Sequence, residues 1–209
     1  MPPFGVLHIC MGNICRSPMA ERLFAAAVRQ VAGELADELV YSASAGTGGW
    51  HEGQPMNPPA ARQLRARGGD DTGFTARRLR AEHIDTADLV LTATAEQVEY
   101  VVSLRPDAAG RTFVLGELGR LLPAVDLASL PPAELRPEAV AARGAALVEA
   151  LHAARGGRAA EPGDEVEDPW GRGDRHFSRV ADVIDRVVRP LAEALLLQRA
   201  GAPSRTRVT

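Results

Sequence analysis

A cysteine and an arginine stand in the spacing Cys-x5-Arg near the start of the chain, at Cys10 and Arg16. They follow a short apolar run and precede an Ala-rich segment of helical character. A strand, a tight loop and a helix N-terminus in this order form a cradle for a phosphate dianion, because backbone N–H groups and the positive end of the helix dipole converge there. We therefore expect Cys10 to attack phosphorus as a thiolate and Arg16 to clamp phosphoryl oxygens with its planar guanidinium group.

The other residues of this loop favour the same geometry. Gly12 and Asn13 tolerate the positive φ that inward-pointing amides require. Ser17 can form a hydrogen bond back into the loop, and Pro18 suits the first helical position, where no N–H is needed. The alternative is a buried structural cysteine beside a helix-capping turn, which this context disfavours. The predicted phosphate-binding loop comprises Met11, Gly12, Asn13, Ile14, Cys15 and Ser17, between and beside Cys10 and Arg16.

The segment Cys10–Pro18 resembles the signature of the low-molecular-weight protein tyrosine phosphatases. The resemblance covers roughly residues 4–118 and 165–198 and includes further motifs at 44–47, 87–91 and 167–171. It implies an enzyme that hydrolyses phosphotyrosine in proteins. It also implies that an acid-bearing Asp-Pro loop lies far beyond the cysteine in the chain, and Asp168-Pro169 occupies that place.

Asp168 is the candidate for proton transfer. A leaving phenolate needs a proton, and Pro169 stiffens the loop that would bring the Asp168 carboxyl over the cradle. An Asp-Pro pair alone more often starts a turn. Together with the Cys10 motif and the resemblance, it predicts a catalytic set of Cys10, Arg16 and Asp168 that acts through a phosphocysteine intermediate.

Trp50 and Trp170 are the only tryptophans, and both fall in loops expected to flank the cradle. Two indole walls would form a substrate slot for a planar ring above Cys10, as the resemblance also implies, although tryptophan often packs in the core. Cys15 has two interpretations. It is either a small buried hydrophobic residue or a resolving thiol that forms a disulfide with oxidised Cys10 and protects it.

Three other functions compete with a tyrosine phosphatase. A protein-arginine phosphatase on the same scaffold would, by resemblance, carry threonine at the position of Ile14, so Ile14 favours tyrosine. An arsenate reductase would need a further cysteine to relay the disulfide outward, and the chain has 2 cysteines. A catalytically inactive phosphotyrosine-binding module is disfavoured by the intact nucleophile, clamp and acid.

Composition indicates a soluble protein with neither a nucleic-acid nor a membrane partner. The 209 residues carry a formal net charge of −3, every basic residue apart from histidine is arginine, and no apolar stretch approaches the roughly 20 residues that span a bilayer. The chain begins without a basic-then-apolar leader, so we expect a cytoplasmic protein. The 5 histidines are scattered, so no metal site and no cofactor is expected. The expected partners are a phosphotyrosine-containing protein substrate and phosphate or other oxyanion inhibitors.

Apolar strand-like runs alternate with helical segments. This pattern predicts an α/β fold, a three-layer sandwich with a central four-stranded parallel sheet and the phosphate-binding loop after the first strand. Residues 1–198 would form one domain with a Pro/Ala-rich insertion at about 120–164, and residues 199–209 a disordered tail. The expected strands are 4–9, 39–44, 89–92 and 112–115, and the expected helices are 17–32, 58–67, 96–104, 138–154 and 174–197.

Overall fold

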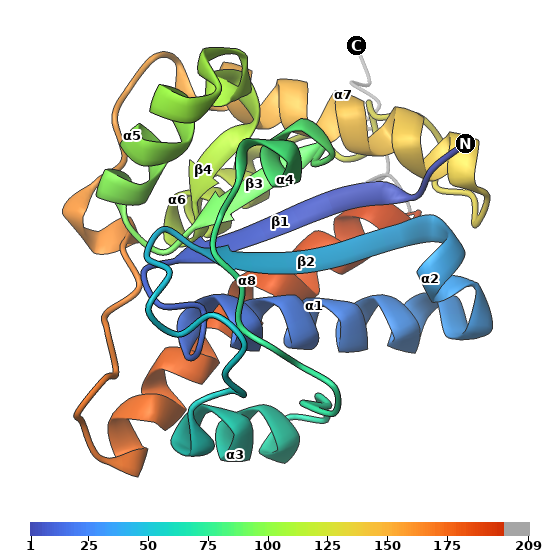
Figure 1. Ribbon diagram of the computed structural model, residues 1–209. Helices are drawn as coiled ribbons and strands as arrows, with labels where there is room; N and C mark the ends of the chain where they lie inside the picture. Colours follow the sequence, from blue (N-terminus) through green and yellow to red (C-terminus); the bar gives the residue numbers. More distant parts are fainter. Residues whose placement is uncertain (199–209) are drawn as a thin grey trace, which may run out of the picture.

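The computed structural model describes residues 1–198, and a four-stranded parallel sheet lies at its centre (Figure 1). The strand order is β2-β1-β3-β4, and every neighbouring pair is parallel. The predicted fold class is confirmed, whereas the tail predicted at 199–209 lies outside the described residues. The strands are β1 (Phe4–Cys10), β2 (Val40–Gly46), β3 (Leu89–Thr92) and β4 (Thr112–Val114).

Strand β1 occupies the interior of the sheet and is buried along its whole length. Phe4 and Val6 join the core on one side of the sheet, and Leu7 and Ile9 join the core on the other. Because both faces are covered, the strand reads in the sequence as a continuous apolar run rather than as an alternation. Its last residue, Cys10, therefore leaves the sheet between two neighbouring strands.

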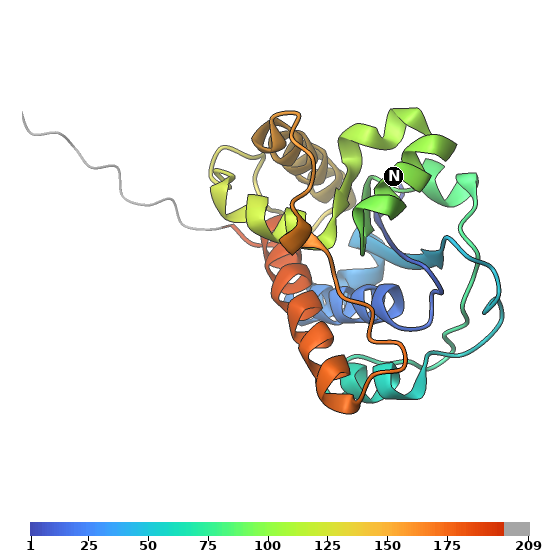
Figure 2. The ribbon, with the colours of Figure 1, turned by 90° about the vertical axis from the view of Figure 1, so that its left-hand side faces the viewer.

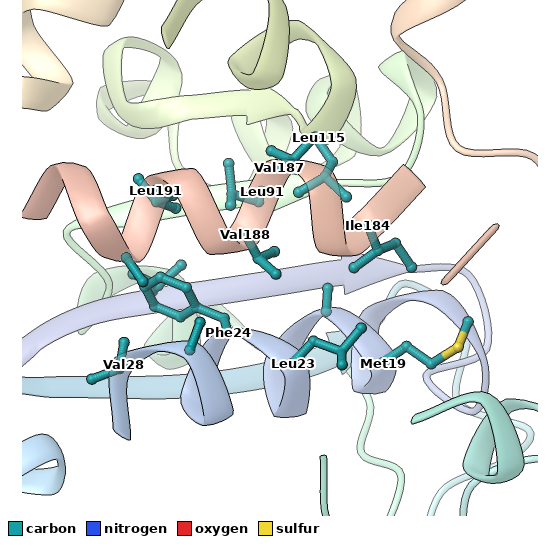
Figure 3. Close-up of a cluster of buried hydrophobic side chains, with 14 of the residues drawn as sticks. Met19, Leu23, Phe24, Val28, Leu91, Leu115, Ile184, Val187, Val188 and Leu191 are labelled. Carbon is teal, nitrogen blue, oxygen red and sulfur yellow. The ribbon is translucent and has the colours of Figure 1, made fainter. Parts of the chain in front are cut away.

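Two long helices cover one face of the sheet. Helices α1 (Arg16–Ala32) and α8 (Asp174–Leu196) pack against each other, and Figure 3 shows Leu23 and Phe24 of α1 facing Val188 of α8. Each large apolar side chain buried in this way stabilises the fold by roughly 1.5–3 kcal/mol. The other face is covered by α4 (Ala81–Asp85) and α5 (Ala95–Leu104), while α3 (Pro58–Ala66) packs against α1 and α8.

The sequence missed three short helices. These are α2 (Ala36–Leu39), α4 and α6 (Leu115–Leu121). Leu115, expected as the last residue of a strand, is instead the first residue of α6. All three elements are too short for a helical period to separate them from a loop in the sequence.

Helix α7 (Pro137–Arg155) lies within the segment predicted as an insertion, and one of its faces belongs to the core. Val140 and Leu147 are buried there, and Gly144 lies so close to Phe4 that an added Cβ would overlap the aromatic ring. The sequence predicted a helix at 138–154 within this segment. The structure adds a buried face that packs on the N-terminal end of β1.

Arg143 of α7 is fully buried and has only carbonyl partners in the described part of the chain. It donates to Ala194 O at 2.7 Å, Pro131 O at 2.5 Å and Leu127 O at 3.3 Å. Burial lowers the pKa of this guanidinium group. Ala194 is in the last turn of α8, where carbonyls lack helical partners, so Arg143 joins α7, the 127–131 loop and the end of α8.

Replacing Gly144 by alanine tests how closely α7 packs on β1. Helix propensity alone would stabilise the variant by about 1 kcal/mol, but overlap with Phe4 should outweigh it and destabilise the protein by about 1–3 kcal/mol. Urea denaturation measures the difference. The control is Ala145→Gly at the neighbouring exposed position, which should lose about 1 kcal/mol through propensity. A more stable Gly144→Ala protein would contradict the tight contact.

Candidate active site

Residues 11–15 connect the end of β1 to the start of α1, and the carbonyls of Cys10, Met11 and Ile14 accept hydrogen bonds from neighbouring segments. In the described part of the chain, none of the backbone amides of residues 11–16 has a protein acceptor, and no side chain caps α1. Such a group of amides at a helix N-terminus binds anions. The outward carbonyl bonds are Thr47 N to Cys10 O at 3.0 Å, Gly48 N to Met11 O at 2.9 Å and Asn57 N to Ile14 O at 2.8 Å.

Asn13 holds the loop in this shape. Its φ is 53°, and it is the one non-glycine residue with positive φ in the described chain. Its amide nitrogen donates to Ser17 Oγ at 2.9 Å and Ser44 Oγ at 2.8 Å, while its Oδ1 accepts from Arg77 N at 2.9 Å. These three bonds offset the cost of the left-handed conformation, which is of order 1 kcal/mol or more.

Two predictions about the loop were wrong in detail. Gly12 does not adopt positive φ. Its small size matters instead, because an added Cβ would lie 3.1 Å from the ring of His51. Pro18 is the third helical residue rather than the first, since α1 begins at Arg16. Its missing N–H costs nothing there either, because the first four amides of a helix have no intrahelical acceptor.

A chain of buried polar groups runs from the nucleophile to a carboxyl. Cys10 Sγ lies 3.0 Å from Ser17 Oγ, and Asn13 links Ser17 to Ser44. Ser44 Oγ in turn donates to Glu21 Oε2 at 2.5 Å. Burial raises the pKa of the Glu21 carboxyl, although Ser44 and Arg22 partly offset this effect.

Arg16 and Asp168 meet across the opening of the loop. Arg16 Nη2 lies 3.0 Å from Asp168 Oδ2, and Arg16 Nη1 donates to Val166 O at 3.0 Å. Asp168 is half-exposed, and its Oδ1 accepts from Trp170 N at 3.1 Å. The 165–173 segment that carries Asp168 runs across the C-terminal ends of the strands toward the start of α8 (Figure 2). The carboxyl and the clamp are therefore brought together although 152 positions separate them in the chain.

These side chains enclose a cavity of about 360 Å³. Trp50 and Trp170 stand at its edge with 63% and 56% of their surface exposed, so neither tryptophan is a core residue. Asn13 and Ser17, also predicted for the site, lie buried behind the loop and do not line the cavity. The lining residues are Cys10, Met11, Gly12, Ile14, Cys15, Arg16, Trp50, His51, Asp168 and Trp170.

His51 is the lining residue that sequence reasoning missed. Its ring centroid lies 6.3 Å from that of Trp50 and 5.6 Å from that of Trp170, so it continues the aromatic wall between them. Its Nδ1 lies 2.8 Å from Gln54 Oε1, which orients the ring. In the sequence, only the position of His51 directly after Trp50 points to a place in the site, because the five histidines are otherwise scattered along the chain.

Cys15 is buried at the N-cap of α1 and lines the cavity beside Cys10. Burial raises the pKa of its thiol to about 12, and the nearby Cys10 and Asp168 act in the same direction. Cys15 is therefore a neutral thiol at physiological pH and no competitor for Cys10 as the nucleophile. Both cysteines are free thiols, and a protective Cys10–Cys15 disulfide stays a prediction.

Within residues 1–198, no group of three or more His, Cys, Asp or Glu side chains is arranged to hold a metal ion. No helix in the same range has the length and apolar character needed to cross a membrane.

The family model described as low molecular weight phosphotyrosine protein phosphatase matches residues 5–120. The chain belongs to this family. The family predicted from the Cys10–Pro18 signature is thus confirmed. Asp168 lies beyond the matched residues, so its place in the site comes from the structure.

A curated relative is the low molecular weight protein-tyrosine-phosphatase YfkJ of Bacillus subtilis, 37% identical over 131 residues, or 60% of this chain and 78% of YfkJ. The low molecular weight protein-tyrosine phosphatase A of Mycobacterium tuberculosis is 38% identical over 51% of this chain. That match covers 63% of the length of phosphatase A, which is less than two thirds. Among solved structures, the YwlE arginine phosphatase of Geobacillus stearothermophilus superimposes with a TM-score of 0.60 at 25% identity, covering 91% of this chain and 92% of that one.

Replacing Glu21 by glutamine tests the buried carboxyl. Because burial raises the folded-state pKa of Glu21, the folded protein retains a proton that the unfolded chain loses above about pH 4.5. The free energy of unfolding of the wild type should therefore fall relative to that of Glu21→Gln as the pH rises from about 4 to about 7. Urea denaturation across this range measures the difference. Glu38→Gln, at an exposed position, is the control and should show no such trend.

Proposed function

We propose that this phosphatase hydrolyses phosphotyrosine in proteins through a phosphocysteine intermediate. One observation carries the proposal: Cys10, Arg16 and Asp168 line a single cavity whose edge is formed by two exposed tryptophans. The names of the curated relatives, which are protein-tyrosine phosphatases, support the choice of substrate. The roles of the individual residues are proposed from the geometry of this chain.

In the first step the Cys10 thiolate attacks phosphorus in line. A sulfur–phosphorus bond forms as the bond from phosphorus to the tyrosine oxygen breaks, and the leaving oxygen takes a proton from Asp168. The amides of residues 11–16 and the Arg16 guanidinium group stabilise the charge on the three equatorial oxygens. Arg16 Nη2, which donates to Asp168 in this structure, must then also donate to the phosphate.

In the second step water attacks the phosphocysteine. Asp168, now a carboxylate, takes a proton from the water, the sulfur–phosphorus bond breaks, and inorganic phosphate leaves Cys10 as a thiolate. The Ser17 hydroxyl, 3.0 Å from Cys10 Sγ, stabilises the thiolate as a leaving group by donating a hydrogen bond to it. The two steps together consume one water molecule and use no cofactor or metal ion.

A protein-arginine phosphatase is the alternative that a specific comparison favours, since YwlE shares the fold at 25% identity. Against it, the apolar Ile14 lines the cavity and offers no partner to guanidinium donors. An inactive phosphotyrosine-binding module would retain the same cavity and show no turnover. Both alternatives are separated from our proposal by the kinetic measurements below.

Several broader properties belong to the same proposal. Phosphate and other oxyanions should inhibit by occupying the amides of the loop. We place the protein in the cytoplasm, where a reduced Cys10 is maintained. We also interpret residues 1–198 as one domain with an insertion at about 120–164, an assignment that the core position of α7 supports.

The Asp168→Asn variant tests proton donation. An aryl phosphate whose phenolate is a poor leaving group should lose about 10²–10⁴-fold in turnover, the usual contribution of general acid–base catalysis. A substrate whose leaving group needs no proton should lose less. Steady-state kinetics with a series of substituted phenyl phosphates measures this difference, and equal losses across the series would assign Asp168 a structural role.

The Cys10→Ser variant is the companion experiment. It should lose turnover completely while retaining phosphate binding, because the loop amides and Arg16 remain. Calorimetric titration with inorganic phosphate measures the binding. Substantial residual hydrolysis would contradict a phosphocysteine mechanism.

Selectivity between aryl phosphates and phosphoarginine tests the wall of the cavity. Each unpaired guanidinium donor buried against Ile14 and the tryptophans would cost about 1–3 kcal/mol. Phosphotyrosine should therefore exceed phosphoarginine by at least about tenfold in kcat/KM. Phosphoserine should be poorer still, because its short side chain cannot reach Cys10. Ile14→Thr should narrow the gap between tyrosine and arginine, and faster turnover of phosphoarginine by the unmodified protein would overturn the assignment of the substrate.

A further inference from the structure

Two arginines beside the cavity have no partner for their charge. Most arginines of the protein form ion pairs or bind carbonyls, but within residues 1–198 the guanidinium groups of Arg78 and Arg172 form neither a hydrogen bond nor an ion pair. Both residues are exposed. A solvated, unpaired guanidinium group retains its full capacity to bind a carboxylate.

Arg78 lies on the Trp50 side of the cavity. It forms a β-bridge to Gly46, which is itself paired with Cys10 in the sheet. Two steps across neighbouring strands place the Arg78 backbone about 10 Å from that of Cys10. The stem of Arg78 packs over Gly49, where an added Cβ would lie 3.0 Å from Arg78 Cδ. Arg78 is thereby held beside the tryptophan wall.

Arg172 follows Trp170 by two residues, at the other end of the aromatic wall from Trp50. Its amide donates to Pro169 O at 3.0 Å and closes the turn that follows Asp168. This turn also contains Gly171, whose φ of 72° suits glycine. The backbone of Arg172 is therefore held close to Asp168, and its exposed side chain extends from that turn.

The carboxylates near the opening are already engaged. Asp168 pairs with Arg16, and Glu165 accepts from the amide of Ala95. Glu167 Oε2 lies 3.3 Å from His176 Nε2, a contact that is an ion pair only when the imidazole is protonated. Glu52 lies 3.7 Å from Arg80, and Asp174 lies 2.7 Å from Arg62. Near the opening of the cavity, Arg78 and Arg172 thus have no carboxylate partner within residues 1–198, although the whole chain carries a formal net charge of −3.

We propose that Arg78 and Arg172 bind acidic side chains on either side of the phosphotyrosine, so that the substrate class is a phosphotyrosine within an acidic segment. The inference rests on the proposed function and narrows it. An extended peptide advances about 3.3 Å per residue, so residues two to three positions from the phosphotyrosine lie about 7–10 Å from it along the peptide. Carboxylates at these positions on both sides match the placement of the two arginines.

The test compares phosphotyrosine peptides of one length whose flanking residues are all Glu, all Ala or all Lys. The wild type should favour the Glu peptide over the Ala peptide by about 2- to 20-fold in kcat/KM at low salt, since each exposed ion pair contributes about 1.5- to 5-fold. The difference should fall mainly on KM, because these contacts lie away from the reacting atoms. It should shrink in about 1 M salt, where the Debye length is about 3 Å.

Substitutions then identify the residues. Arg78→Gln and Arg172→Gln should each reduce the ratio of Glu to Ala peptide, and the double variant should abolish it. The matched control is Arg186→Gln, an exposed arginine of α8 beside Leu122 and Pro123, which should leave the ratio unchanged. The double variant Arg78→Glu with Arg172→Glu should favour the Lys peptide. A merely structural role of either arginine would not reverse the preference.

The outcomes separate the two proposals. Equal kcat/KM values for Glu, Ala and Lys peptides, with all three hydrolysed, would overturn the acidic-segment inference and leave the tyrosine phosphatase intact. A preference that survives the double variant would also overturn it, because other groups would then be responsible. Absence of turnover with every phosphotyrosine peptide would reject the proposed function and this inference with it.

Discussion

The run of unpaired backbone amides between β1 and α1 is the constraint on which the rest of the site depends. The N–H groups of residues 11–16 have no protein acceptor in the described chain, whereas the carbonyls of Cys10, Met11 and Ile14 accept from the amides of Thr47, Gly48 and Asn57. The loop connects an interior strand of the sheet to a helix that packs on α8, so both of its ends are immobilised. Cys10 ends β1 and Arg16 begins α1, so the two ends of the loop fix the positions of both residues.

A strained residue is tolerated at the centre of this loop because a buried network holds it. Asn13 has three hydrogen bonds that would all be lost in a relaxed conformation. The same network reaches the Cys10 sulfur through Ser17 and a buried carboxyl, Glu21, through Ser44. In a low-dielectric interior such a chain is stable only when every member has a partner, which explains why small hydroxyl and amide side chains occupy these places.

The site divides the chemistry from the recognition of the substrate. Cys10 and Arg16 are buried, whereas Trp50, Trp170, Arg78 and Arg172 are exposed. A rigid anion cradle and adaptable loop residues around it are a common arrangement, because the reacting atoms tolerate little displacement while surrounding contacts can vary. Far from the cavity, Arg143 and Gly144 of α7 close the opposite end of the sheet.

The local sequence determined the strand, the loop and the helix that build the candidate site. The apolar run to Cys10, the Gly-Asn pair and the helical period after Arg16 predicted the strand, the loop and the helix, because each depends on residues close in the chain. Tertiary structure alone decided what depends on distant residues. It paired Arg16 with Asp168, placed His51 between the two tryptophans and buried a face of α7 against Phe4. Two predictions about the loop also changed. Gly12 is needed for its small size beside His51, and Pro18 is the third residue of α1 rather than the first, because packing sets the space at Gly12 and the start of the helix.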